Sequence, residues 1–239
     1  MMFMKKNLSF ILGIFSLLLF TSCVKDPINP GYAQYMFINA APDVAAGVDF
    51  FVGDLKQNIL PIAFGSNTGY NSTTPGTKSI RVTIAGQQTV FSANNYNVSD
   101  LRDQPARYTL LAVNKIQNAE LVWIQDNLTT PAAGKAHLRI IHASADAPAV
   151  NAYVGTATTA IFPSALSFKG SSSFVPLNAT LLGTPYSIQI RNATTNAIIR
   201  TQPMTAVSGK IYTIVVRGSV TPSPWLPANT VSTTLVANN

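Results

Sequence analysis

Short runs of alternating apolar and polar residues dominate the chain after its first two dozen positions. The segment YSIQIR at 186–191 alternates with a period of two, which is typical of a strand with one face in a core and the other in water. Similar runs, rich in β-branched and aromatic residues, are separated by clusters of Gly, Pro, Asn and Ser. In the second half of the chain they predict strands at 138–143, 150–154, 172–175, 186–191, 198–204, 211–217 and 231–236. No segment after Cys23 keeps a 3.6-residue apolar period, so we expect an all-β protein.

One stretch of this pattern occurs twice. The segment INAAPDVAAGVDFFVG (38–53) aligns with IHASADAPAVNAYVG (141–155) when Gly47 is treated as an insertion, and Asp43 then falls opposite Asp146. Later segments also match in order, SIRV with SIQI and YTLLAV with YTIVVR. The spacing of about a hundred residues is the length of one sandwich domain.

The repeat predicts the domain organisation. We expect two tandem immunoglobulin-like β-sandwich domains, the first at residues 34–127 and the second at 136–239. The segment LTTPAAGK at 128–135 is the expected linker between them.

The first residues predict export and a lipid anchor. Lys5 and Lys6 precede an apolar run at 8–20 that is too short to span a bilayer, which is typical of a signal peptide over residues 1–22. The closing FTSC resembles a bacterial lipobox, in which Cys23 is acylated and becomes the new N-terminus. The alternative is an ordinary signal peptide with a chance cysteine, but Cys23 is the only cysteine in the chain.

The residues after Cys23 bear on the destination of the protein. Residues 23–33 contain two prolines and a glycine, which favour an extended tether. Val24 is similar to the outer-membrane sorting pattern of Gram-negative lipoproteins, and Lys25-Asp26 resembles the short charged export tag of surface-displayed lipoproteins in the Bacteroidetes. The expected location is the outer membrane, on its periplasmic or its surface-exposed face.

Scarcity of charge excludes one class of partner. Charged residues make up 10% of the chain, and removing residues 1–22 lowers the formal net charge from +7 to +5. The remaining Lys and Arg are scattered singly, whereas a nucleic-acid-binding face needs them clustered, so we expect no nucleic-acid partner.

The second copy carries a family resemblance. The segment HLRIIHASADAPAVNAYVG resembles the opening of the bacterial domain of unknown function 4397, whose members begin with a strand followed by VHASPDAPAVDVYVDG. GKIYTIVVRG (209–218) resembles a later strand of that family, AGTYTVVVTG. The first copy departs at Asn39, Ala41 and Ala45, which replace the His, Ser and Pro of the motif. The resemblance implies two copies of an exported or lipid-anchored β-sandwich, and it implies no activity.

The motif HASADAP allows two interpretations. His142, Ser144 and Asp146 are spaced two apart, so a continuing strand would place them on one face, like the members of a nucleophilic triad. However, side chains that project in parallel do not converge on one point, as a nucleophile and its base must. In the second interpretation Asp146 forms an Asx-turn and Pro148 fixes the path into the next strand, while Asp43, after Pro42 and with Gly47 as the extra residue, forms a similar corner by other means. His142 and Ser144 then bond to loop backbone, or serve as ligand contacts.

Other candidate sites are few. The two histidines point to opposite faces of a strand, and carboxylates are too spread for a calcium loop, so we expect no metal and no other cofactor. Trp225 lies in TPSPWLPAN, a proline-rich loop; an exposed indole there is a candidate ligand contact, whereas a buried one would pack under its own loop or against the first domain.

These observations favour a non-enzymatic, lipid-anchored cell-envelope protein that serves as an adhesion, scaffold or binding module. Its expected partners are the membrane, through the N-terminal lipid, and an envelope protein or a glycan. The alternative is a glycan-binding lipoprotein of a polysaccharide uptake system. A third interpretation is a hydrolase centred on His142.

Overall fold

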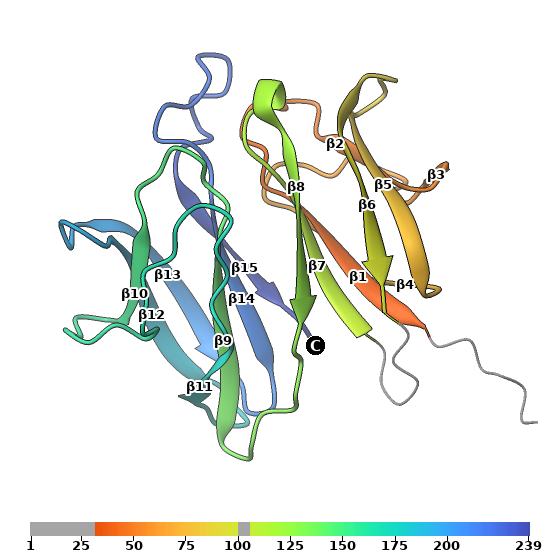
Figure 1. Ribbon diagram of the computed structural model, residues 1–239. Helices are drawn as coiled ribbons and strands as arrows, with labels where there is room; N and C mark the ends of the chain where they lie inside the picture. Colours follow the sequence, from red (N-terminus) through yellow and green to blue (C-terminus); the bar gives the residue numbers. More distant parts are fainter. Residues whose placement is uncertain (1–31, 100–105) are drawn as a thin grey trace, which may run out of the picture.

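The fold is built almost entirely of strands (Figure 1). The computed structural model describes residues 32–99 and 106–239. Its only helical element in these ranges is a single 3-10 turn, η1 (Ile116–Asn118), so the all-β prediction is confirmed. Cys23, the signal peptide and most of the tether lie outside the described residues. Within the described ranges no helix has the length and apolar character needed to cross a membrane.

The first repeat is a sandwich of two four-stranded sheets, with strand orders β4-β1-β7-β8 and β3-β2-β5-β6. Its strands are β1 (Ala33–Asn39), β2 (Val48–Val52), β3 (Leu55–Lys56), β4 (Asn67–Thr73), β5 (Gly76–Ile84), β6 (Val90–Val98), β7 (Ala106–Val113) and β8 (Glu120–Asp126). In the first of these sheets β1 pairs with β7 in parallel, and the other pairs are antiparallel.

The second repeat has the same topology except that it lacks a counterpart of β3. Its sheets have the orders β11-β9-β14-β15 and β10-β12-β13, and β9 again pairs with β14 in parallel. Its strands are β9 (Lys135–His142), β10 (Val150–Val154), β11 (Val175–Asn178), β12 (Thr184–Asn192), β13 (Ile198–Ala206), β14 (Ile211–Arg217) and β15 (Ser232–Ala237). The duplicated order confirms that the chain consists of two tandem sandwiches.

Six of the seven strands expected in this half lie where the pattern predicts them, and one does not. The strand expected at 172–175 is observed at Val175–Asn178, so the prediction overlaps it by one residue. β11 is an edge strand that pairs only with β9, so the missing N–H of Pro176 is tolerated within it.

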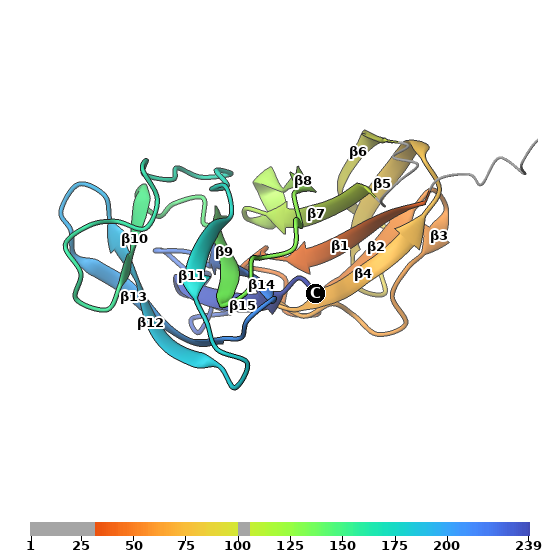
Figure 2. The same cartoon turned by 90° about the horizontal axis from the view of Figure 1, so that it is seen from below.

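The two repeats lie side by side, with their four-stranded sheets β4-β1-β7-β8 and β11-β9-β14-β15 facing each other (Figures 1 and 2). Each repeat has its own core, and a third apolar cluster fills the junction. The junction cluster consists of Met36, Ile38, Ala40, Leu111, Val113, Ile141, Ala143, Val215 and Val236. Strands β1, β7, β9 and β14 are therefore buried on both faces, which explains their nearly continuous apolar runs.

A buried ion pair crosses the same junction. Nη1 of Arg139, on β9, lies 2.6 Å from Oδ1 of Asp126, at the end of β8, and both side chains are almost fully buried. The other oxygen of Asp126 accepts hydrogen bonds from Tyr70 and Thr109 of the first repeat. Nε of Arg139 donates to Thr213 of the second repeat.

The network around this pair closes into a ring. Thr213 donates to the side chain of Asn238, whose amide donates to the hydroxyl of Tyr70, which in turn donates to Asp126. Within the ring Asp126 Oδ2 accepts two hydrogen bonds, and Oδ1 is held by the ion pair with Arg139. The ring joins the two repeats into one body.

Candidate functional site

The corner after β9 contains His142, which is fully buried. Its Nδ1 accepts the N–H of Ser144 at 3.3 Å, and its Nε2 lies 2.9 Å from the carbonyl oxygen of Pro148. Because a carbonyl only accepts and an N–H only donates, the ring is the neutral tautomer with its proton on Nε2. Burial lowers the pKa of His142, which keeps the ring neutral.

Asn39 makes two bonds of the same kind in the first repeat, although its donor bond reaches a different segment from that of His142. Its Oδ1 accepts the N–H of Ala41 at 3.1 Å, and its Nδ2 donates to the carbonyl of Ile62 at 2.8 Å. The amide of Asn39 therefore reproduces the acceptor and donor of the His142 ring. The replacement of His by Asn between the copies preserves the acceptor for the N–H two residues further on, whereas the donor bonds to Pro148 in one copy and to Ile62 in the other.

The structure does not assemble His142, Ser144 and Asp146 into a triad. Ser144 donates its hydroxyl to the carbonyl of Gly218, at 2.8 Å, and both ring nitrogens of His142 are already engaged with backbone groups. Asp146 bonds to Ser219 and Val220, next to Gly218 in the β14–β15 loop, rather than to His142. A nucleophile needs a base within hydrogen-bond reach, and these three side chains do not provide that arrangement.

Asp146 does lie in the corner, but the expected Asx-turn is not its role. Its carboxylate accepts hydrogen bonds from the N–H groups of Val220 and Thr221 and from the hydroxyls of Ser219 and Thr221, at 2.5 to 3.1 Å. The residue two positions after Asp146 is Pro148, which has no N–H to donate. The carboxylate instead holds the beginning of the β14–β15 loop.

Asp43 has the equivalent role in the first repeat. Both of its oxygens accept the N–H of Ile116, at 3.0 and 3.1 Å, in the segment that follows β7. In each repeat the corner aspartate therefore holds the loop after the strand that runs parallel to the first strand. This shared contact explains why the aspartate recurs while its neighbours differ.

The hydrogen bonds at Asp146 favour its charged form. Partial burial by itself raises the pKa of this carboxyl, but the hydrogen bonds from Ser219, Val220 and Thr221 outweigh burial and lower the pKa to about 2. The carboxylate is therefore charged at neutral pH and remains bonded to the loop.

Trp225 lies in that loop and is 89% exposed. Packing under its own loop or against the first domain, the alternative considered above, is therefore not observed. The other tryptophan, Trp123, is stacked between Tyr96 and Tyr108 with ring centroids 4.7 and 4.5 Å away. Trp123 is thus half-buried, whereas the indole of Trp225 is almost fully presented to solvent.

The first repeat braces both ends of the β14–β15 loop. Lys115 donates to the carbonyl of Thr221 at 2.8 Å, and Asn229 donates to the carbonyl of Pro42 at 2.7 Å. A cavity of about 330 Å³ lies between Lys115 and Asp146, at the base of the loop. The exposed Trp225 is thus carried by a loop fixed to both repeats.

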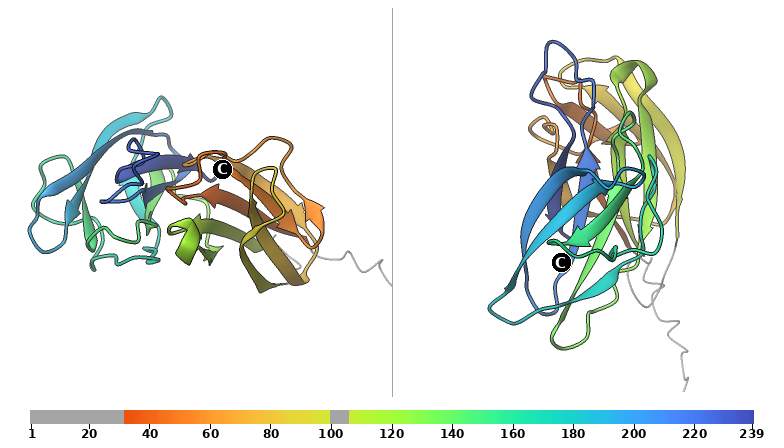
Figure 3. Two further views of the ribbon diagram at one scale, coloured as in Figure 1. Left: turned by 90° about the horizontal axis from the view of Figure 1, so that it is seen from above. Right: turned by 90° about the vertical axis from the view of Figure 1, so that its left-hand side faces the viewer.

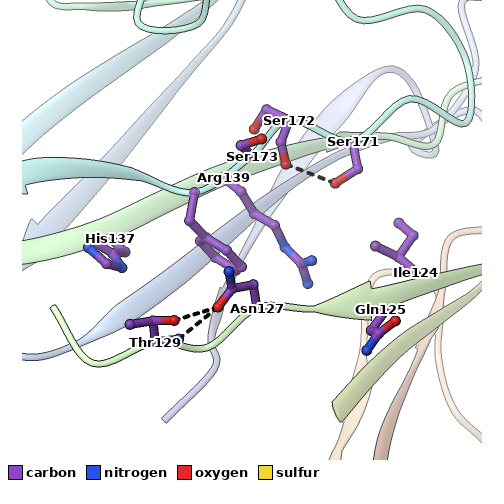
Figure 4. A pocket seen from close by; sticks show the side chains of 10 residues that line it. Ile124, Gln125, Asn127, Thr129, His137, Arg139, Ser171, Ser172 and Ser173 are labelled. Atoms are coloured by element: carbon purple, nitrogen blue, oxygen red, sulfur yellow. Dashed lines mark hydrogen bonds between the residues drawn. The ribbon is translucent and has the colours of Figure 1, made fainter. Parts of the chain in front are cut away.

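A second hollow lies in the junction itself, away from this loop (Figure 4). It has a volume of about 400 Å³ and is lined by Ile124, Gln125, Asn127, Thr129, His137, Arg139, Ser171, Ser172, Ser173 and Phe174. Except for His137 and Arg139, its polar side chains are hydroxyls and amides. The guanidinium of Arg139 lies 4.7 Å from the ring centre of Phe174, and its charge is paired with Asp126.

In residues 32–99 and 106–239, no group of three His, Cys, Asp or Glu side chains comes close enough to hold a metal ion. Besides the two clefts at the junction, two hollows of the first repeat, of about 290 and 400 Å³, also offer a ligand polar side chains.

The family comparison agrees with the duplicated corner. The family described as Domain of unknown function (DUF4397) matches the chain twice, over residues 33–153 and 136–239. The chain belongs to the DUF4397 family. No curated protein matches it. In both DUF4397 repeats the signature aspartate, Asp43 or Asp146, holds the loop after the parallel strand.

Several residues of the junction escaped sequence reasoning. Asp126 and Arg139 are separated by the linker, and each stands in a strand pattern that gives no sign of its partner. The one sign of a buried ion pair in the sequence was Arg139, a charged residue within the apolar run HLRIIH. The hollow of Figure 4 was also missed, because its lining comes from both DUF4397 repeats.

Proposed function

We propose that the protein is a non-enzymatic, lipid-anchored binding module of the cell envelope that presents the β14–β15 loop to a partner. The observation that supports this most directly is the exposure of Trp225 on a loop braced by both repeats. An exposed indole offers a large contact area with little conformational entropy to lose, and tryptophan is enriched among residues that dominate binding energy.

The position of the loop fits a lipid-anchored protein. Strand β1 begins at Ala33 and runs towards the corner that holds Pro42, which contacts the loop through Asn229. In Figure 1 the β14–β15 loop stands at the upper end, whereas β1 begins at the lower end of the first repeat. An acyl group on Cys23 would therefore attach the molecule by the end opposite Trp225, at the outer membrane, on its periplasmic or surface-exposed face.

The test is a pull-down from envelope extracts together with a glycan array, using the mature, unacylated protein. Trp225→Ala should lose the captured partner while keeping the wild-type melting temperature. The matched control is Ile59→Ala, which removes another highly exposed apolar side chain, on a different loop. Equal binding by Trp225→Ala and the wild type would overturn the proposed binding loop.

The anchor is tested separately. Cys23→Ala should move the protein from the membrane fraction to the soluble fraction, and retention in the membrane would contradict the anchor. Protease treatment of intact cells then distinguishes surface display, where the protein is cleaved, from periplasmic residence, where it is protected.

The hollow of Figure 4 favours a second candidate function, glycan capture for a polysaccharide uptake system. Hydroxyl and amide side chains beside the Phe174 ring match the hydroxyls and apolar face of a neutral sugar, and the Arg139 charge is already paired. Asn127→Ala and Ser173→Ala should abolish glycan-array signals that Trp225→Ala leaves intact. The reverse result would assign any glycan to the loop instead.

A further inference from the structure

The turn between β11 and β12 carries two leucines in water. Leu181 is 84% exposed and Leu182 is 99% exposed. Removing a leucine side chain from water is favourable, so an adjacent exposed pair at the tip of a turn is a surface suited to an apolar contact.

Lysines flank this turn. The N–H of Ala179 bonds to the carbonyl of Gly134, and the N–H of Ser208 bonds to the carbonyl of Thr180, which brings Lys135 and Lys210 beside the turn. Nζ of Lys135 contacts the amide oxygen of Asn178, and Nζ of Lys210 contacts the main-chain oxygen of Asn239. Neither ammonium group is paired with a side-chain carboxylate.

Acidic side chains are almost absent from the second repeat. Within residues 136–239 the only Asp or Glu is Asp146, and it is held at the opposite end, in the corner after β9. The end that carries Leu181 and Leu182 is thus apolar at its tip and positively charged at its sides.

This end of the second repeat faces the same way as the beginning of β1. The turn is bonded to residues next to Lys135, where β9 begins, and the corners that follow β1 and β9 both meet the β14–β15 loop region. Figure 1 and the right panel of Figure 3 show the β11–β12 end away from the β14–β15 loop.

We propose that Leu181 and Leu182, with Lys135 and Lys210, form a second contact with the lipid surface to which the acyl group on Cys23 attaches the chain. This inference rests on the proposed lipid anchor. A two-residue tip is too small for a stable protein interface, which buries at least about 1,200 Å². A bilayer surface, in contrast, accepts a short apolar tip and attracts the cations beside it through anionic headgroups.

The anchor makes such a weak contact effective. Two leucines and two lysines bind a membrane only marginally from solution. Attachment through Cys23 makes the contact intramolecular, so its effective concentration is high. The contact fixes the orientation of the molecule, with the Trp225 loop directed away from the bilayer.

The experiment uses the acylated full-length protein, reconstituted into vesicles of phosphatidylethanolamine and phosphatidylglycerol. Because acylation consumes the thiol of Cys23, Leu182→Cys introduces the only free thiol, to which a polarity-sensitive fluorophore is attached. We expect a blue-shifted emission and severalfold protection from an aqueous quencher. The matched control, Trp225→Cys with the same fluorophore, should emit as in water and be fully quenched.

The outcomes separate this inference from the proposed function. Failure of the protein to float with the vesicles would mean that the anchor is wrong. Flotation with equal quenching at positions 182 and 225 would overturn the membrane contact alone. A blue shift that appears without vesicles and rises with protein concentration would show contact with a second copy, and would also overturn it.

The contribution of the two lysine charges is tested separately. The double variant Lys135→Gln and Lys210→Gln should reduce the protection at position 182, and so should omitting phosphatidylglycerol from the vesicles. Unchanged protection in both cases would exclude the lysines from the contact. All four residues lie at the surface, so the melting temperature should remain that of the wild type.

Discussion

Arg139 and Asp126 face each other across the junction of the two repeats, 2.6 Å apart and shielded from water. Leaving one partner of a buried pair without the other usually costs about 3–5 kcal/mol. We therefore predict that Asp126→Ala lowers the free energy of unfolding by about that amount in urea titrations. The double variant Asp126→Leu and Arg139→Met removes both charges and should recover most of the loss. An equal loss in the double variant would show that the charges themselves, rather than the unpaired group, are essential.

The correspondence of Asn39 with His142 predicts a pH effect. Because burial lowers the pKa of His142 in the folded state, the unfolded chain binds a proton more readily. The stability contribution is therefore present above the ordinary pKa of about 6.5 and is lost as the pH falls below it. We predict that the melting temperature of the wild type declines from pH 7 to pH 5, and that His142→Asn keeps the fold and flattens this decline.

The matched control removes the other histidine. His137→Asn leaves the buried ring in the corner, so the decline with falling pH should persist. A decline of the same size in His142→Asn would contradict the assignment of the effect to His142.

Asp146 should stabilise the protein over a different pH range. We predict that Asp146→Ala lowers the free energy of unfolding by about 1–2 kcal/mol at pH 7, a modest value because the carboxylate is partly solvated. Since the folded-state pKa lies below the ordinary value of 3.8, this contribution is present above pH 4 and is lost as the pH falls towards about 2.

The comparison for this variant is Asp146→Asn. Its amide keeps one acceptor oxygen for the loop, so its loss at pH 7 should be smaller than that of Asp146→Ala. Equal stability of Asp146→Ala and the wild type across the whole range would show that the loop holds without the carboxylate.

Gly218 sets the start of the loop that carries Trp225. Its φ is +99°, and a Cβ at this position would overlap the carbonyl oxygen of Thr230. We predict that Gly218→Ala lowers the melting temperature and weakens any binding that depends on Trp225. Gly209→Ala is the control, because Gly209 also has a positive φ, of +83°, but no atom lies near its Cβ position. Gly209→Ala should show only the backbone cost of about 1–2 kcal/mol.

The parts of this structure that depend on local sequence were predictable. Strands such as β10 and β14 follow from alternation and β-branched residues, and the alignment of Asp43 with Asp146 revealed the duplication. The parallel pairing within each repeat then placed both aspartates in the same environment.

Other features depend on residues distant in the chain. The donors to Asp146 lie 73 to 75 residues further along, so the local sequence suggested an Asx-turn that Pro148 cannot complete. The exposure of Trp225 is likewise set by where the first repeat fixes the ends of its loop. Pattern alone reveals neither, because both arise from packing between segments.

The strands buried on both faces have a consequence for the evolution and engineering of the chain. Cut at the linker, each half would expose the sheet face that now meets the other half, including Ile38 and Leu111 on one side and Ile141 and Val215 on the other. The halves would then associate with each other or aggregate, as the subunits of an obligate dimer do when separated. The molecule is in effect a dimer whose subunits share one polypeptide, and a single repeat is not a unit that can be transplanted by itself.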